Sequence, residues 1–109
     1  MDITKQIENS ELSDFSKRVY LCLLAVPKGN VTTYKALAEK AGTHGYRAIG
    51  MVMNRNPFSP AVPCHRVVAN DGSLHGFAGE LAEKEQMLHN EGVPVVNGKV
   101  PEKFILRCL

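Results

Sequence analysis

One short segment, Pro63-Cys64-His65-Arg66-Val67-Val68, constrains this chain more than any other. Pro63 stiffens the approach to the cysteine because its ring fixes φ. Val67 and Val68 are β-branched, which favours a short buried strand. The segment therefore predicts a thiol held in a fixed position at the start of a strand, with a histidine and an arginine directly after it.

Cys64 has two possible roles. A thiol becomes a nucleophile when a nearby positive charge or a base makes it a thiolate, and His65 and Arg66 supply both kinds of help. Alternatively, Cys64 is a small apolar core residue whose basic neighbours point to water. The Cys-His pair alone favours this second role, because most free cysteines are structural.

The composition limits the class of protein. A chain of 109 residues predicts a single domain, residues 1–109, with a modest core. No apolar run reaches the length of a membrane span, and the N-terminus lacks the hydrophobic region of a signal peptide. Three widely spaced cysteines without a Cys-x-x-Cys pattern predict neither zinc nor a disulfide framework. A reducing cytoplasm suits a protein that needs a free thiol. Because no segment could span a membrane, we expect no membrane partner.

The first half of the chain predicts helices. Residues 1–12 are polar without a clear period, which predicts a loose lead-in. Ser13 can cap a helix that runs to about Val26. Its apolar face places Cys22 in the core and consists of Phe15, Val19, Cys22, Leu23 and Val26.

Two further short helices follow. Thr33 can cap one that runs to about Ala41 and ends at Gly42, and the next runs from Thr43 or His44 to about Asn54. The buried face of the later helix is expected to consist of Ala48, Ile49, Val52 and Met53. Two short helices joined by a glycine turn predict a helix-turn-helix, whose second helix lies in a DNA groove.

The second half predicts loops, hairpins and one helix. Residues 56–63 are proline-rich and cannot be helical. Two hairpins are expected, one around residues 70–72 and one around residues 97–98. Between them, a loop at residues 76–79 precedes a helix over residues 81–91. The side expected to face the protein carries Leu81, Lys84, Leu88 and Glu91. Phe104, Ile105 and Leu106 are available to pack in the tail.

Several motifs, in order and spacing, resemble the O6-alkylguanine-DNA alkyltransferases, from about Phe15 to Gly92. They are Val31-Thr32-Thr33-Tyr34-Lys35-Ala36-Leu37-Ala38, Tyr46-Arg47-Ala48-Ile49-Gly50, Asn54-Arg55-Asn56-Pro57, Pro63-Cys64-His65-Arg66-Val67-Val68, Gly76-Phe77-Ala78-Gly79, and Lys84-Glu85 with Glu91-Gly92. The resemblance implies a mainly α, α+β fold with small β hairpins, of the winged helix-turn-helix type. Its core would cover residues 13–93, after the lead-in 1–12 and before a hairpin and tail at 94–109.

The resemblance also implies an activity. The protein would rotate an O6-alkylguanine out of double-stranded DNA and move the alkyl group to Cys64, once per molecule. No cofactor and no metal are implied, and a monomer is expected. The place of action would be the cytoplasm, with the nucleoid in a prokaryote or the nucleus in a eukaryote. Other protein partners are not indicated by the sequence.

Residue roles follow from the same resemblance. Cys64 would be the nucleophile and His65 its base, with Glu91 hydrogen-bonded to His65 and favouring its protonated form. Adjacent residues on a strand point to opposite faces, so His65 would reach the sulfur through a water molecule or a local bend. Asn56 would hold the loop beside the thiol. Taken alone, Glu91 fits an exposed helix end and Asn56 an ordinary Asn-Pro turn.

Tyr34 and Arg47 would handle the DNA. Tyr34 would press on the phosphate beside the lesion and donate a proton to the leaving base, and Arg47 would fill the vacated stack. Taken alone, these residues fit a half-buried helix tyrosine and a surface arginine. The substrate pocket would be formed by Val67, Phe77, Ala78, Gly79 and Lys84.

The chain departs from the family pattern in three ways. No segment corresponds to the N-terminal domain of better known members. Phe77 replaces a usual tyrosine, which removes a hydroxyl contact to the base, and Ala78 replaces a common serine. Two alternatives therefore stay open: an alkyltransferase-like protein that binds the lesion with little transfer, although such proteins usually lack the cysteine, and a helix-turn-helix regulator.

Overall fold

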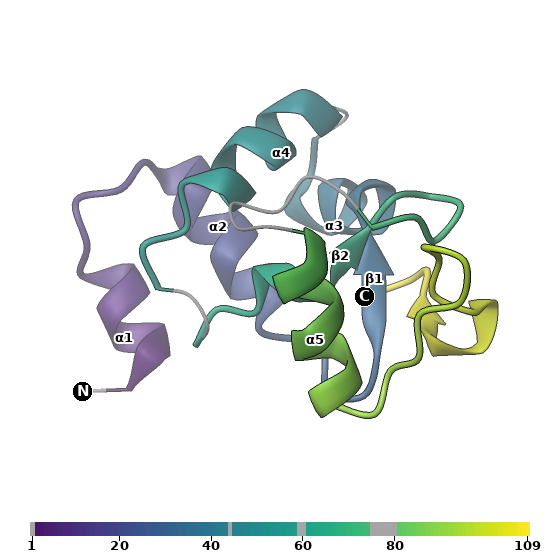
Figure 1. The fold of residues 1–109 in the computed structure, drawn as a ribbon. Coiled ribbons are helices and arrows are strands. Elements are labelled where there is room, and N and C mark those ends of the chain that lie inside the picture. Colours follow the sequence, from purple (N-terminus) through teal and green to yellow (C-terminus); the bar gives the residue numbers. More distant parts are fainter. Residues whose placement is uncertain (1, 44, 59–60, 75–80) are drawn as a thin grey trace.

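A computed structural model describes residues 2–43, 45–58, 61–74 and 81–109 of the protein (Figure 1). Its elements follow in the order α1 (Ile3–Glu8), α2 (Asp14–Leu23), β1 (Val31–Thr33), α3 (Tyr34–Ala41), α4 (Tyr46–Asn54), the 3-10 turn η1 (Cys64–Arg66), β2 (Val67–Val68), α5 (Leu81–Asn90), the 3-10 turn η2 (Glu102–Phe104) and β3 (Ile105–Leu106). The α+β fold class predicted from the sequence is confirmed.

The N-terminal segment is a helix, so the predicted loose lead-in is wrong. The Asp2 side chain accepts a hydrogen bond from the Lys5 amide at 3.0 Å and caps α1. Ile7 is fully buried in the core formed with α2. Ile3 packs beside it and is partly buried. Two apolar residues in a six-residue helix are too few for a periodic pattern, which is why this helix could not be recognised from its sequence.

Helix α2 begins where it was predicted and ends earlier. Ser13 Oγ accepts from the Ser16 amide at 3.1 Å, which confirms the cap. The helix stops at Leu23 rather than near Val26, although Val26 is still buried. Cys22 packs against the core as predicted, but it is only partly buried and lies at the edge of the core.

Helices α3 and α4 form the predicted helix-turn-helix. Thr33 Oγ1 accepts from the Ala36 amide at 3.0 Å, and Gly42 ends α3 with φ +80°. This left-handed conformation favours glycine. Helix α4 begins at Tyr46, later than predicted, because Thr43 Oγ1 binds the Gly45 amide at 3.0 Å in a local turn. On α4, Ile49, Val52 and Met53 are buried and Ala48 is partly exposed.

The strands form a parallel sheet in the order β2-β1-β3. Thr32 pairs with Val67, and Val31 pairs with Ile105. The first predicted hairpin is confirmed only at its turn, where the Ala69 amide donates to the Ser73 carbonyl at 2.9 Å. Its arms do not pair with each other: Val67 and Val68 pair with β1, and Ser73 pairs with Lys99. Pairing to β1 buries both faces of β2, which a hairpin with the polar segment after it would not do.

The second predicted hairpin is confirmed. Val96 and Lys99 exchange backbone hydrogen bonds of 2.8 and 3.1 Å. Asn97 and Gly98 between them have φ values of +53° and +77°. This is the conformation that favours an Asn-Gly turn.

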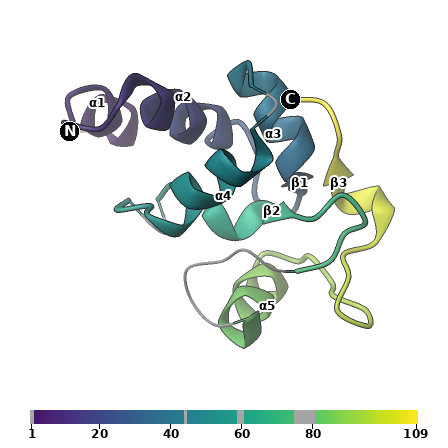
Figure 2. The same ribbon diagram turned by 90° about the horizontal axis from the view of Figure 1, so that it is seen from above.

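The sheet separates two layers of packing, as Figure 2 shows, with α5 on one side of the strands and α2 and α3 on the other. Val67 belongs to the core under α1–α4, whereas Val68 belongs to the core with Leu88 of α5. Ile105 of the tail packs into this second core, but Leu81 is 53% exposed, contrary to its predicted inward position. No helix among the described ranges is both long and apolar enough to cross a membrane.

Candidate active site

Cys64 lies in a buried turn where the two layers meet. The amide of Cys64 donates to the Val62 carbonyl, and the Arg66 amide donates to the Pro63 carbonyl, each at 2.9 Å. The segment is a 3-10 turn before β2, not the first part of the strand. The local bend that was one of two predicted alternatives is therefore present, and the alternation expected for a strand does not apply to Cys64 and His65.

Asn56 closes the loop that leads to the cysteine. Its Nδ2 donates to the Val62 carbonyl at 2.8 Å, and its Oδ1 accepts from the Phe58 amide at 2.9 Å. One side chain thus joins both ends of the described part of the loop. Because Val62 also accepts from the Cys64 amide, Asn56 acts one residue away from the turn that carries the thiol.

His65 is buried and hydrogen-bonded to Glu91. The distance from His65 Nε2 to Glu91 Oε2 is 3.0 Å. Burial lowers the pKa of His65, and it outweighs the raising effect of Glu91. The prediction that the site favours protonated His65 is therefore wrong. Burial destabilises the imidazolium more than the nearby Glu91 carboxylate stabilises it.

The other ring nitrogen of His65 is available for chemistry. Nδ1 is buried and has no hydrogen-bond partner within the part of the chain that the structure describes. Donation from Nε2 to the carboxylate leaves the lone pair on Nδ1. A neutral imidazole in this tautomer can accept a proton from a group next to η1.

Arg66 is a member of the site that the sequence reasoning did not assign. Its Nε and Nη2 donate to the two oxygens of Glu91 at 2.9 and 2.6 Å, and its Nη1 donates to the Val26 carbonyl at 2.9 Å. Burial alone would raise the pKa of Glu91, but hydrogen bonds from Arg66 and His65 hold it below its usual value. Glu91 is thus an ionised carboxylate fixed by a bidentate pair.

Only the tertiary structure reveals this pair. Glu91 follows the end of α5, and Arg66 ends η1, so the two are 25 positions apart in the sequence. The arginine after the Cys-His pair was the available signal. The sequence predicts that its positive charge assists the thiol, but a local pattern does not show which carboxylate it pairs with.

Lys84 lies beneath β2 with none of its surface exposed. Its Nζ donates to the Val67 carbonyl at 2.7 Å. Burial lowers the pKa of Lys84 to about 8, against a smaller raising effect of negative charge on Cys64. The lysine therefore ties α5 to the strand after the cysteine and is electrostatically coupled to the thiol.

Tyr34 is the first residue of α3 and is partly buried. Burial, with a smaller contribution from negative charge on Cys64, raises the pKa of Tyr34 to about 12. Its hydroxyl is therefore protonated at neutral pH and can donate. The pKa values of both Tyr34 and Lys84 are affected by negative charge on Cys64, so both side chains lie within electrostatic range of the thiol.

The remaining predicted residues lie elsewhere. Arg47 is exposed near the start of α4, on the surface of the helix-turn-helix rather than in the buried site. Phe77, Ala78 and Gly79 lie outside the described residues. Over the described ranges, no group of three His, Cys, Asp or Glu side chains could hold a metal ion.

Known proteins share this arrangement of sequence and fold. The chain is 44% identical over 82 residues to a methylated-DNA–protein-cysteine methyltransferase of Methanosarcina barkeri, covering 74% of this chain and 52% of the relative. It is 43% identical over 79 residues to the protein of that name from Salmonella typhimurium, covering 72% of this chain and 46% of the relative. The chain thus spans about half the length of these relatives.

Solved structures agree with this. An O6-methylguanine-DNA methyltransferase from Pyrococcus kodakaraensis matches with a TM-score of 0.69 and 43% identity, over 75% of this chain and 48% of the other. A Mycobacterium tuberculosis OGT in complex with DNA matches with a TM-score of 0.71 and 35% identity, over 74% and 51%. Schizosaccharomyces pombe Atl1, at 23% identity and a TM-score of 0.75, covers 90% and 99% and shares the fold.

One family model covers the part of the chain that carries the helix-turn-helix and the cysteine turn. The family model described as "6-O-methylguanine DNA methyltransferase, DNA binding domain" matches residues 14–93. This chain therefore belongs to the 6-O-methylguanine DNA methyltransferase DNA-binding domain family.

Proposed function

We propose that the protein repairs O6-alkylguanine in double-stranded DNA by moving the alkyl group to Cys64. The observation that carries this proposal is the buried Cys64 turn beside His65, whose ring is oriented by the Glu91–Arg66 pair. A thiol, a base and an orienting carboxylate form the arrangement that nucleophilic cysteine chemistry requires.

The reaction begins with the thiol proton. Neutral His65 accepts it, and the resulting thiolate attacks the alkyl carbon of the lesion. A sulfur–carbon bond forms while the bond between the alkyl carbon and O6 of guanine breaks. Tyr34, protonated at neutral pH because its pKa is raised to about 12, donates a proton to the leaving guanine. Protonated His65 then releases its proton to solvent, and Tyr34 regains a proton from solvent. In the net reaction, the thiol loses one proton and the released guanine gains one.

The product limits each molecule to one reaction. A thioether is not cleaved by water at neutral pH, and the mechanism contains no second nucleophile that would release the alkyl group. The protein is thus consumed in a single turnover, as a methylated-DNA–protein-cysteine methyltransferase that needs no cofactor.

The lesion has to leave the duplex to reach a buried thiol. Arg47, exposed on α4, would occupy the space that the flipped base leaves. Val67, Lys84 and the segment Phe77–Gly79 would form the pocket, with Asn56 holding its edge. Such chemistry needs a reduced thiol near DNA, so the protein would act in a reducing compartment, either the cytoplasm at the nucleoid or the nucleus.

Mass spectrometry tests the proposal directly. We expect incubation with an O6-methylguanine duplex to add one CH₂ to the intact protein, located on the Cys64 peptide, and Cys64→Ser to add none. Unchanged mass despite tight binding to the lesion would support a lesion-binding protein without transfer. Preference for one undamaged sequence would support a transcription regulator, and either result would overturn the proposal.

A further inference from the structure

The exposed side of α4 carries an apolar residue between two cations. Arg47, Met51 and Arg55 are spaced by four residues, so they lie along one side of the helix and its C-cap. All three are exposed, and Met51 is 48% exposed. Isolated exposed apolar residues are common, but Met51 differs from them because Arg47 and Arg55 flank it on the same side of the helix.

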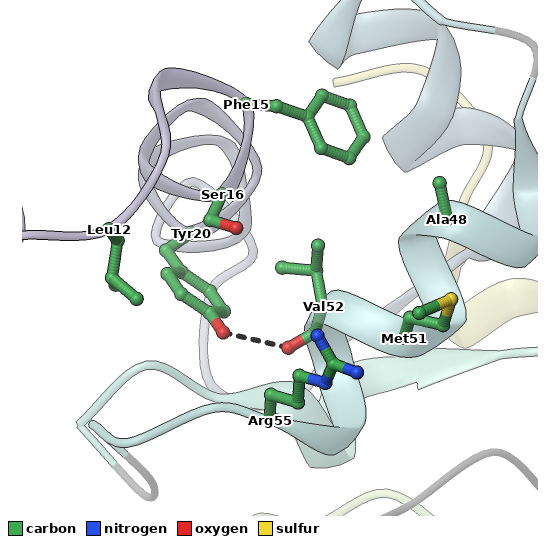
Figure 3. Close-up of a pocket in the computed structure, with 8 residues that line it drawn as sticks. All are labelled: Leu12, Phe15, Ser16, Tyr20, Ala48, Met51, Val52 and Arg55. Atoms are coloured by element: carbon green, nitrogen blue, oxygen red, sulfur yellow. Dashed lines mark hydrogen bonds between the residues drawn. The ribbon is translucent and has the colours of Figure 1, made fainter.

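The surroundings of Met51 leave it room to move. A Cβ atom built on Gly50 would meet no atom within 4 Å, so the helix surface beside Met51 is open. On its other side, a hollow of about 290 Å³ separates α4 from α2 (Figure 3). Met51 stands at the rim of this hollow, opposite Phe15 and near Arg55. An unbranched thioether with three rotatable bonds can therefore turn either into the hollow or away from it.

The base of this hollow is fixed. Tyr20 of α2 donates from its hydroxyl to the Val52 carbonyl of α4 at 2.7 Å, and its ring meets Phe58 edge to face. Because Val52 directly follows Met51, this bond anchors the backbone from which the methionine projects. Met51 thus projects from a helix backbone that is held in place.

This arrangement matches the chemistry of an opened duplex. Arginine side chains pair with phosphates along the rim of a groove, whereas apolar side chains, methionine among them, insert between base steps and unstack them. Met51 lies about 6 Å along the helix from Arg47, from the rise per residue. Both can reach the same few base pairs.

We propose that Met51 is an apolar wedge that packs against the bases beside the flipped lesion and works together with Arg47. The inference rests on the proposed function, since it assumes that this side of α4 meets the damaged duplex. It assigns the two side chains different tasks. Arg47 fills the vacated stack, and Met51 shields the neighbouring base step from water.

Substitutions separate size from polarity. Met51→Leu keeps a large apolar side chain. Met51→Gln keeps the length of the side chain but adds a polar amide, and Met51→Ala removes the side chain beyond Cβ. Val96→Ala, at a hairpin position that is 57% exposed, is the control for loss of an exposed apolar group. Thermal unfolding checks that all variants are folded. We expect little change in their melting temperatures, because Met51 and Val96 are both exposed.

Three measurements are compared: transfer rate from an O6-methylguanine duplex, transfer rate from free O6-benzylguanine, and fluorescence of 2-aminopurine placed beside the lesion. We expect Met51→Ala and Met51→Gln to slow duplex repair about tenfold and to reduce the fluorescence change, with Met51→Leu and Val96→Ala within about twofold of the original protein. Free-base rates should stay within about twofold in all variants, because no stack is opened there.

The salt dependence of duplex affinity gives an independent criterion. Loss of an apolar contact should leave the slope of affinity against salt unchanged, whereas Arg55→Ala should reduce it by about one. Duplex rates and fluorescence for Met51→Ala and Met51→Gln equal to those of the original protein would overturn the proposal, as would equal losses on duplex and free base. If the original protein transfers no methyl group, the proposed function fails, whereas fluorescence and affinity still decide whether Met51 is a wedge.

Discussion

At the residue scale, the site depends on one carboxylate that serves two partners. Glu91 accepts from His65 and binds Arg66 through both oxygens, while Arg66 also binds the Val26 carbonyl. The histidine next to the nucleophile is therefore oriented by a group that is itself fixed. These contacts hold the buried His65 ring in one orientation and favour one tautomer.

Substitution of Glu91 tests this orientation. Burial lowers the pKa of His65, and Glu91 opposes that effect, so Glu91→Gln should lower the pKa further. The transfer rate should fall as pH decreases through the pKa of His65, because imidazolium cannot accept the thiol proton. We expect the acid limb to move to lower pH in Glu91→Gln, with about a ten- to hundredfold lower rate at neutral pH from lost orientation.

Single-turnover transfer between about pH 5 and 9, together with affinity for lesion DNA, measures this prediction. Glu85→Gln is the matched control, because Glu85 is a partly exposed glutamate paired with His89 at 3.9 Å within α5. Its rate and profile should match those of the original protein. Unchanged rates in both Glu91→Gln and His65→Ala would reduce this pair to a structural role.

At the element scale, α4 presents the cation that separates flipping from chemistry. Arg47 is exposed on α4 and takes no part in the chemistry at the thiol. Because it would fill the space left by the flipped base, Arg47→Ala should slow repair of duplex DNA by at least about tenfold. Transfer from free O6-benzylguanine should change much less, because that base is already unstacked. Both rates are measured by quenched reaction, with Lys103→Ala in η2 as the control for loss of an exposed cation.

Equal losses on duplex and free base would show that Arg47→Ala damages the fold or pocket. The intercalating role would then be withdrawn. Cys64→Ala should give the opposite pattern, with transfer abolished on both substrates while lesion binding is retained.

Helix α1 gives a second prediction at this scale. Ile7 is fully buried against the helical core, so Ile7→Ala should lower the free energy of unfolding by about 2–4 kcal/mol. Urea unfolding measures the change, and Thr4→Ala, at an exposed position of the same helix, should change it by less than about 0.5 kcal/mol. A similarly small effect of Ile7→Ala would mean that α1 is detached from the core in solution.

Local signals explain which elements could be predicted. Ser13 and Thr33 cap the amide three residues on, and Gly42 adopts the left-handed conformation, so these helix boundaries are encoded within a few residues. The Asn97-Gly98 turn is encoded in the same way. Helix α1 has a cap of the same kind at Asp2, but within its six residues only Ile3 and Ile7 pack against the core, which is too few for a recognisable period.

At the scale of the whole molecule, the site forms where long-range pairings meet. Strand β1 joins β2 from 35 positions away and β3 from 74 positions away, and strands of two or three residues carry no period that would reveal these pairings. The residues around Cys64 could be named from the resemblance. The Arg66–Glu91 pair and the Lys84 bond to Val67 could not, because they arise only when α5 is placed against η1 and β2.

The parallel sheet also helps to hold the cysteine turn in place. Val67 packs under the helices and Val68 under α5, so β2 is held from both sides directly after η1. Asn56 fixes the loop before the turn. The nucleophile is thus held at both ends by elements that are far apart in the sequence.

The stoichiometry of transfer tests the central claim most directly. The protein is incubated with a tenfold excess of O6-methylguanine duplex, and repaired guanine is counted while intact mass reports the modified protein. The account predicts a plateau at one repaired lesion per molecule, with one CH₂ on Cys64 and none on Cys22 or Cys108. Repair that continues well beyond the amount of protein, or a plateau without alkylated Cys64, would contradict it.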